Sequence, residues 1–254
     1  MDHDTLNAHR TTLYRLKLEL IAHYAAGAGH TVRAGPFTGL RLPTNGHWGG
    51  GDHLSKVFGL YEAPLHGIFE DALALGYPLF VDVGCADGYY ATGFALKSPR
   101  TRCFGYDLDG GAQRSAQAQV IENGLANCRI RGAFVAGALT ALRAECRVPE
   151  TARVLVKCDI EGAELELFNA DFCAELTHCD VLIELHDYRD DTRIEEALRA
   201  RLNPSHRLTT VCEGPRNANA HAFLRDLPED VRWLVTSESR WSAMRWLWAT
   251  SRAT

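Results

Sequence analysis

From residue 79 onward, short apolar segments alternate with helical patterns, and this alternation constrains the fold more than any other feature of the sequence. Seven segments predict strands: 79–83, 102–107, 128–132, 154–159, 181–186, 208–212 and 244–249. Most of the intervals between them predict helices, such as 113–123 and 194–202. Regular alternation of strand and helix implies a mainly parallel sheet with helices on both faces. We therefore expect a doubly wound α/β fold over residues 77–254.

The first 76 residues lack this alternation, and we expect them to form a helical and hairpin extension that packs on the sheet domain. Apolar residues at helical spacing predict an amphipathic helix: Leu13, Leu16, Leu20 and Tyr24. Residues 31–42 predict a small hairpin or extended arm, and a second helix follows Pro64 and ends at Gly76. Five residues of the extension are candidates for a lid over a binding site: His47, Trp48, Lys56, Tyr61 and Glu62.

The composition of the chain argues against several classes of protein. Of the 254 residues, 46% are hydrophobic and 23% are charged, which is ordinary for a folded chain and excludes wholesale disorder. The formal net charge of -5 argues against a nucleic-acid-binding protein that depends on a basic surface. The sequence predicts no membrane span and no secretory signal. Eight cysteines without a C-x-x-C pair are expected to be buried, reduced thiols, which favours a cytoplasmic protein.

The first predicted strand runs into a glycine-containing loop, Gly84-Cys85-Ala86-Asp87-Gly88-Tyr89-Tyr90. Such a loop lets a nucleotide-like ligand approach the backbone closely. The dinucleotide pattern G-x-G-x-x-G fails twice, at Ala86 and Tyr89. The loop is more similar to the G-x-G-x-G loop of class I methyltransferases, which fits at Gly84 and Gly88, with Asp82 just before it and Ala86 as a departure. A plain strand-to-helix turn is the structural alternative.

Asp107 ends the second predicted strand, about twenty residues after the glycine loop, where nucleotide-binding α/β folds place a ribose-binding acid. Both vicinal hydroxyls of a ribose can donate to one carboxylate. A helix cap is the alternative role for this residue, and Asp109 is its competitor as the ribose ligand. We prefer Asp107 because it lies closer to the end of the strand.

Four segments between residues 58 and 186 carry a resemblance to a known family: Phe58-Gly59-Leu60-Tyr61-Glu62, Val81-Asp82-Val83-Gly84-Cys85-Ala86-Asp87-Gly88-Tyr89-Tyr90, Lys157-Cys158-Asp159-Ile160-Glu161-Gly162-Ala163-Glu164 and Ile183-Glu184-Leu185-His186. Through them the chain resembles a class I S-adenosylmethionine-dependent methyltransferase of the FkbM type. Many methyltransferases share the glycine loop, whereas the Asp-x-Glu-Gly-Ala-Glu segment is more specific to the FkbM type.

The resemblance implies a seven-stranded, Rossmann-like sheet with the last strand antiparallel, and S-adenosylmethionine over the carboxyl ends of the first two strands. It assigns these residues to the cofactor: Asp82, Gly84, Cys85, Ala86, Asp87, Gly88, Tyr89, Asp107, Leu108, Phe134, Tyr61 and Glu62. Class I enzymes often place an acid near the adenine after the third strand. Here that stretch is Gly132-Ala133-Phe134, so we expect backbone groups and Phe134 to hold the adenine.

Polar residues follow the fourth and fifth predicted strands, although strands of a parallel sheet are normally apolar. They are Asp159, Glu161, Glu184 and His186. Ligands bind at the carboxyl edge of such a sheet, so these side chains are expected to converge on one site. The alternative roles, without catalysis, are a helix cap for Asp159 and an orienting or solvent-facing side chain for His186.

The chemistry of methyl transfer suggests roles for this cluster. Sulfur loses its positive charge in the transition state, so carboxylates beside it would stabilise the substrate more than the transition state. We therefore assign the acids to the acceptor. His186 is the expected general base, with Asp159 and Glu184 as orienting groups. The same three residues are also candidate ligands for a divalent metal. Glu238, Arg240 and Trp241 precede the last strand and are candidates to line the acceptor pocket.

The sequence thus predicts an enzyme that transfers a methyl group to a small-molecule acceptor, at oxygen, without nucleic-acid or membrane partners. The first alternative is an enzyme that uses S-adenosylmethionine for alkyl transfer or cyclisation. The second is a non-catalytic cofactor-binding protein, against which the acid and histidine cluster argues. An NAD-dependent enzyme is disfavoured by Ala86 and Tyr89.

Overall fold

A seven-stranded sheet forms the centre of the protein. The structure, a computed structural model, describes residues 2–43, 50–187 and 191–253. The strands are β1 (Leu79–Val83), β2 (Arg102–Tyr106), β3 (Cys128–Arg131), β4 (Val154–Cys158), β5 (Cys179–Leu185), β6 (His206–Cys212) and β7 (Arg245–Ser251). Their order across the sheet is β3-β2-β1-β4-β5-β7-β6, and β7 runs antiparallel to both of its neighbours. The predicted fold class, strand number and antiparallel last strand are confirmed.

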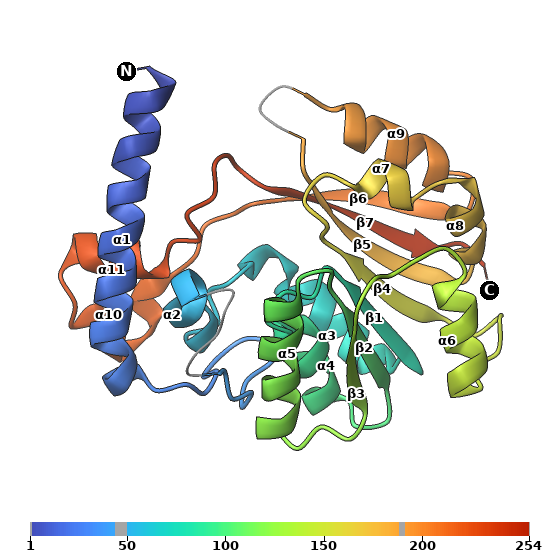
Figure 1. Ribbon diagram of the computed structural model, residues 1–254, viewed down its shortest axis with the longest axis horizontal. Helices are drawn as coiled ribbons and strands as arrows, with labels where there is room; N and C mark the ends of the chain where they lie inside the picture. Colours follow the sequence, from blue (N-terminus) through green and yellow to red (C-terminus); the bar gives the residue numbers. More distant parts are fainter. Residues whose placement is uncertain (1, 44–49, 188–190, 254) are drawn as a thin grey trace.

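Helices cover both faces of the sheet, because side chains of a strand alternate between its faces. In β1, Phe80 points into a core with α3 (His66–Leu75), α4 (Tyr89–Lys97) and α5 (Gly110–Glu122). Val81 points into the opposite core, which includes side chains of α6 (Ala138–Cys146), α8 (Ala170–Glu175) and α9 (Arg193–Leu202). The short α7 (Glu164–Leu167) follows β4 in the chain and lies beside α9 in Figure 1. Because these helices cover the faces of the sheet, a ligand can still reach the carboxyl ends of β1, β2 and β4 at its edge.

The first helix, α1 (His3–Ala28), buries a different face from the predicted one. Leu20 and Tyr24 pack against the core as expected, but Leu13 and Leu16 are 52% and 45% exposed. Lys17 is fully buried instead, and its Nζ donates to the carbonyl oxygen of Ser237 at 2.6 Å. The polar loop after α11 (Glu229–Thr236) therefore sets the orientation of the helix. Figure 1 shows α1 at one end of the molecule, beside α10 (Ala222–Arg225) and α11.

The rest of the extension contains short elements. A single antiparallel bridge between Thr31 and Arg41 closes the small hairpin predicted for residues 31–42. Three short helical segments follow, η1 (Gly50–Asp52), α2 (His53–Val57) and η2 (Ala63–Leu65), and a further one, η3 (Ala218–Ala220), precedes α10. The helix α3 ends, as predicted, at Gly76, which adopts a φ of 73°.

The extension shares a core with the sheet domain. The ring of Phe37 makes edge contacts with Phe69, Tyr89 and Tyr90, at centroid distances of 5.3 to 5.7 Å. Gly93 of α4 faces the same ring, and a methyl group there would overlap it. The predicted boundary near residue 77 stays a prediction, and the lid candidates His47 and Trp48 lie outside the described residues.

Two further expectations concern the whole chain. The eight cysteines are unpaired, and five of them are buried: Cys85, Cys103, Cys128, Cys158 and Cys179. The expectation of buried thiols is wrong for Cys212, which is exposed, and Cys146 and Cys173 are half-buried. Among the helices that the structure describes, none has the length and apolar character needed to cross a membrane.

Candidate active site

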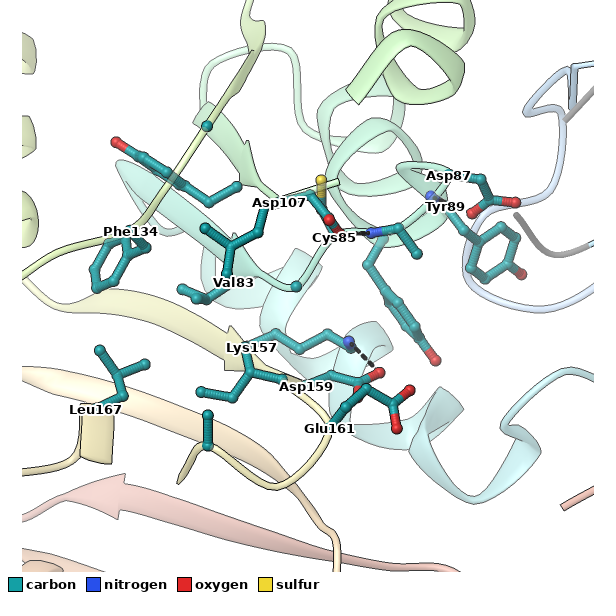
Figure 2. Close-up of a pocket in the computed structure, with 18 of the residues that line it drawn as sticks. Val83, Cys85, Asp87, Tyr89, Asp107, Phe134, Lys157, Asp159, Glu161 and Leu167 are labelled. Carbon is teal, nitrogen blue, oxygen red and sulfur yellow. Dashed lines mark hydrogen bonds and ion pairs between the residues drawn. The ribbon is translucent and has the colours of Figure 1, made fainter. Parts of the chain in front are cut away.

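A cavity of about 730 Å³ opens at the carboxyl ends of the central strands. The glycine loop, the residues after β2, β3 and β4, and three residues of the extension line it. In the close-up of Figure 2, Phe134 and Leu167 lie at one side of the cavity, Asp87 and Tyr89 at the other, and Asp107 between them. The predicted cofactor loop and the predicted acid thus meet in one hollow.

The glycine loop needs its glycines for two reasons. Gly84 adopts a φ of 78°, and a methyl group there would overlap the carbonyl oxygen of Asp159. Gly88 adopts a φ of 85°, and a methyl group would come within 2.8 Å of Ala116 in α5. Ala86, the departure from the pattern, still adopts a positive φ of 49°. The loop therefore turns tightly against both β4 and α5, which leaves its outer side facing the cavity.

Asp107 is fixed in the wall of the cavity. Its Oδ2 accepts a hydrogen bond from the backbone of Ala86 at 2.9 Å, and its Oδ1 accepts one from the backbone of Asp109 at 2.9 Å. The helix cap is the role of Asp109, whose carboxylate accepts from the backbone of Ala112 at the start of α5. Leu108 beside it is 83% exposed and lines the cavity mouth. The geometry therefore favours Asp107 over Asp109 as the ligand-facing acid.

Phe134 occupies the end of the cavity near β3. Its ring makes edge contacts with Tyr106 and Phe172, at centroid distances of 5.0 and 5.5 Å. The neighbouring stretch of the wall, residues 132–136, carries no acid. Glu166 lines the cavity from α7. This end therefore offers a flat aromatic surface and backbone groups.

Three of the predicted cofactor residues, Asp82, Gly88 and Glu62, do not line the cavity. Asp82 is fully buried behind the loop, where it accepts from the backbone of Ala91 and lies 3.6 Å from the Nζ of Lys157. Glu62 is also buried and accepts from the hydroxyl of Tyr90. Tyr61 does line the cavity, so the extension contributes to its wall.

The acid and histidine cluster converges as the strand pattern predicted, with His186 at its centre. The Nε2 atom of this residue lies 3.6 Å from an oxygen of Asp159, 3.4 Å from one of Glu161 and 3.8 Å from one of Glu184. The other ring nitrogen, Nδ1, is 2.7 Å from Oε1 of Glu164, which is fully buried. Asp159 and Glu161 line the cavity, so the cluster adjoins it.

The surrounding carboxylates control the charge of His186. Burial disfavours the protonated ring, but the hydrogen bond with Glu164 and the negative charge of Asp159 outweigh it and raise the pKa of His186 to about 9. Burial and the negative charge of Asp159 raise the pKa of Glu184, whereas the guanidinium of Arg240 opposes this shift. The cluster is therefore crowded with negative charge and holds a proton on the ring at neutral pH.

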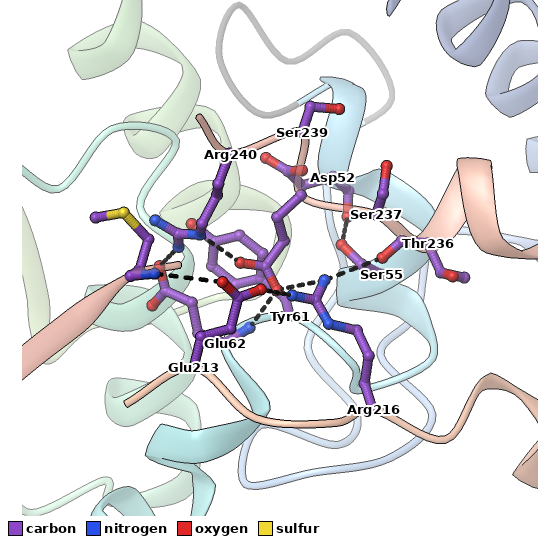
Figure 3. A network of polar contacts seen from close by, with 12 residues as sticks. Asp52, Ser55, Tyr61, Glu62, Glu213, Arg216, Thr236, Ser237, Ser239 and Arg240 are labelled. Atoms are coloured by element: carbon purple, nitrogen blue, oxygen red, sulfur yellow. Dashed lines mark hydrogen bonds and ion pairs between the residues drawn. The ribbon is translucent and has the colours of Figure 1, made fainter. Parts of the chain in front are cut away.

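Glu184 also belongs to a network of buried ion pairs around Arg240. Figure 3 shows the part of this network that contains Glu62, Arg216 and Arg240. The guanidinium of Arg240 contacts Glu184 at 2.6 Å, Glu238 at 2.7 Å, and Glu62 from the extension. Arg216 contacts the other oxygen of Glu238 at 2.8 Å. Glu238, Arg240 and Trp241 were candidates to line the acceptor pocket, but none of them is in the lining of this cavity. The guanidinium of Arg240 is held by the carboxylates instead.

Three residues of this site were not among the predicted cofactor or catalytic residues: Glu164, Lys157 and Lys56, the last of which was a candidate for the lid. Glu164 and Lys157 stand at the ends of one of the segments that carry the family resemblance. Their place in that segment was the feature of the sequence that could have pointed to them. Lys157 is buried with its Nζ 3.5 Å from Asp159, and the nearby acids raise its pKa although burial opposes the charge. Lys56, from α2, lines the cavity opposite Phe134 and forms an ion pair with Asp87.

Comparisons with known proteins bear on the fold. The sequence matches no protein-family model and no curated protein. Among solved structures, the bifunctional kinase-methyltransferase WbdD is similar, with a TM-score of 0.51 at 14% identity, over 82% of this chain and 42% of that one. This likeness shows the class I methyltransferase fold, and by itself nothing of the reaction.

Two other similar structures have lower scores. One is the precorrin-6y C5,15-methyltransferase from Geobacter metallireducens, with a TM-score of 0.46 at 11% identity, over 73% of this chain and 88% of that one. The other is the O-methyltransferase TomG from Streptomyces achromogenes, solved in complex with S-adenosylmethionine, with a TM-score of 0.45 at 14% identity, over 72% of this chain and 77% of that one.

Proposed function

We propose that this protein transfers a methyl group from S-adenosylmethionine to an oxygen atom of a small-molecule acceptor, as a methyltransferase of the FkbM type. The observation that carries the proposal is the placement of Asp107. Its carboxylate stands at the end of β2, tied to the backbone of Ala86 in the glycine loop, on the wall of a cavity large enough for a nucleoside and an acceptor. The segment from Asp159 to Glu164 supports the subtype.

The residues of the wall fit the parts of S-adenosylmethionine. Asp107 would accept the ribose hydroxyls, and Phe134 and Leu108 would enclose the adenine. When bound, the molecule supplies an electrophilic methyl group on a positively charged sulfur. The protein contributes mainly by holding donor and acceptor in line, which accounts for a large part of the acceleration in such reactions.

The acid cluster is expected to contact the acceptor hydroxyl and not the sulfur. Carboxylates beside the positively charged sulfur would stabilise the substrate more than the transition state. Asp159 and Glu161 face the cavity and would orient a hydroxyl group by accepting its hydrogen bond. The raised pKa of His186 limits its predicted role as general base, because the ring is mostly protonated at pH 7. As a base it would act efficiently only as the pH approaches 9.

A divalent cation is the alternative occupant of the same place. Ligand atoms of Asp159, Glu184 and His186 lie within 4.8 Å of one another. The hydrogen bond between Glu164 and Nδ1 fixes the orientation of the His186 ring, as carboxylates behind metal-binding histidines do. It leaves Nε2 of the ring to bind the cation. Such a cation would lower the pKa of a bound hydroxyl. These donors fit a metal, and no comparison with known proteins speaks for one.

Calorimetry with Mn²⁺ at pH 7 separates these two versions of the site. Saturable binding of Mn²⁺ to chelator-treated protein that Asp159→Asn abolishes would favour the metal. Absence of Mn²⁺ binding would leave the version without a metal, in which His186 accepts the proton efficiently only as the pH approaches 9. The control variant is Glu166→Gln, which changes an exposed acid of the cavity wall outside the cluster.

The proposed activity itself is tested with S-adenosylmethionine and a panel of hydroxylated small molecules. We expect a product heavier by one CH₂ group, formed in equal amount with S-adenosylhomocysteine, as measured by mass spectrometry. A product that carries the aminocarboxypropyl group, or a cyclised product, would contradict methyl transfer while retaining the cofactor.

A further inference from the structure

The end of the cavity opposite Phe134 is closed by a buried ion pair that the proposed function has not yet used. The Nζ atom of Lys56 lies 2.7 Å from Oδ2 of Asp87, and the two side chains are 5% and 8% exposed. Both residues line the cavity. Lys56 comes from α2 in the extension and Asp87 from the glycine loop, so the two parts of the molecule meet at this pair.

Aromatic rings surround the ammonium group of Lys56. Its Nζ lies 4.9 Å from the ring centroid of Tyr61 and 5.3 Å from that of Tyr89. Both rings also line the cavity. This enclosure shields the ion pair from solvent, so each charge interacts strongly with a ligand that reaches it.

Counted over the described residues, both members of the pair keep free capacity for hydrogen bonds. An ammonium group has three donors, and Lys56 uses one of them on Asp87. A carboxylate offers about four acceptor positions. Asp87 uses two, one for Lys56 and one for the backbone of Tyr89 at 3.3 Å. The pair therefore presents one positive and one negative group to the cavity, side by side and without net charge.

The order of groups along the cavity indicates what this end receives. Asp107 lies between Phe134 at one side and Asp87 at the other (Figure 2). A ligand with its ribose on Asp107 and its base beside Phe134 must direct its 5′ substituent toward Asp87 and Lys56. In S-adenosylmethionine that substituent ends in an α-amino acid, which carries one carboxylate and one ammonium group.

We propose that Lys56 and Asp87 form the subsite for this amino-acid end, with Lys56 binding the carboxylate and Asp87 the ammonium group. The inference rests on the proposed function and extends it, because it makes the N-terminal extension part of the cofactor site. It also gives the site a means to discriminate against adenine nucleosides without an amino-acid tail. With the ligand bound, the charges of Lys56 and Asp87 and the two charges of the amino acid alternate in a buried site. A ligand that lacks one of its charged groups leaves a protein charge unpaired there, which lowers its affinity.

The test compares three ligands by calorimetry. S-adenosylhomocysteine has both charged groups, its decarboxylated analogue lacks only the carboxylate, and 5′-methylthioadenosine lacks both. With the wild-type protein, we expect loss of the carboxylate alone to weaken binding about ten- to a hundredfold. This comparison needs no variant, so it stands even if a substitution at the ion pair prevents folding.

Substitutions then assign each charge to its partner. Lys56→Met is expected to weaken S-adenosylhomocysteine about ten- to a hundredfold and to leave the two truncated ligands unchanged. Asp87→Asn should weaken both ligands that keep the ammonium group, and leave 5′-methylthioadenosine unchanged. The matched control is Lys97→Met, in the exposed last turn of α4, which should alter none of the three affinities.

The outcomes separate the two proposals. Equal wild-type affinity for S-adenosylhomocysteine and 5′-methylthioadenosine would overturn the subsite and leave the adenosine site in place. Equal weakening of all three ligands by Lys56→Met would mean that the ion pair only supports the fold. Failure of the wild-type protein to bind any of the three would overturn the proposed function itself.

Discussion

Glu164 sets the charge of His186, although the sequence alone assigned it no role in the site. Its buried carboxylate lies 2.7 Å from Nδ1, and it reaches that place because the loop before it turns sharply at Glu161 and Gly162, with φ values of 55° and 103°. The convergence of Asp159 and His186 was predictable, since parallel strands end at one edge of a sheet. The Glu164 contact was not, because it depends on this loop geometry.

The raised pKa of His186 leads to a prediction at the same scale. In an NMR titration of the imidazole ring, we expect His186 to titrate near pH 9, and Glu164→Gln to lower that midpoint because the ring loses its anionic partner. Assignment of the signal comes from His186→Gln. Glu166→Gln, an exposed acid in the same helix, should leave the midpoint unchanged.

The sign of the linked stability follows from the direction of the shift. The folded protein binds the ring proton more tightly than the unfolded chain, whose histidine has a pKa near 6.5. The stabilisation is therefore complete below about pH 6.5 and is lost as the pH rises through about 9. A midpoint for His186 near 6.5 in the folded protein would contradict this description of the cluster.

At the scale of elements, the sequence predicts strands better than helix faces. The bounds of β1 were predicted correctly, because five consecutive residues suited to a buried strand stand between turn signals. The buried face of α1 was predicted wrongly at Leu13 and Leu16. That face is set by Lys17, whose partner Ser237 lies 220 positions away in the chain, so local periodicity carried no sign of it.

The strand-to-loop junction after β1 gives a prediction for an element. Gly84→Ala should lower the free energy of unfolding by roughly 3 kcal/mol or more, because a left-handed φ and an overlap with the Asp159 carbonyl act together. Gly137→Ala is the matched control, since Gly137 has the same φ of 78° and nothing within 4 Å of the added methyl group.

Urea unfolding measures both variants. For the control Gly137→Ala, the free energy of unfolding should fall by only roughly 1–2 kcal/mol, because the alanine must adopt a left-handed backbone conformation but overlaps no neighbour. Equal losses for the two variants would show that the loop does not press against β4 as described.

At the scale of the whole molecule, Arg240 joins three distant segments. Its guanidinium contacts Glu62 of the extension, Glu184 of β5 and Glu238 in the connection before β7. The sequence could not predict this joint, because its members come from three separate parts of the chain and nothing in their spacing relates them. The network links the acid cluster to the extension that closes the cavity.

Arg240→Met should therefore destabilise the protein strongly, by about 3–5 kcal/mol in urea unfolding, because it leaves buried carboxylates without their partner. The comparison is Arg129→Met. Arg129 is 62% exposed in its ion pair with Glu145, so its removal should cost less than about 1 kcal/mol. Similar small losses for both variants would mean that the network does not hold the segments together.

The central claim is that the cavity binds S-adenosylmethionine through the glycine loop and Asp107. Calorimetric titration with S-adenosylhomocysteine tests it most directly, since it needs no acceptor. We expect saturable binding at one site per chain, no competition from NAD, and an affinity that Asp107→Ala weakens about ten- to a hundredfold. Absence of binding, tighter binding of NAD, or an unchanged affinity in the Asp107→Ala variant would contradict the account.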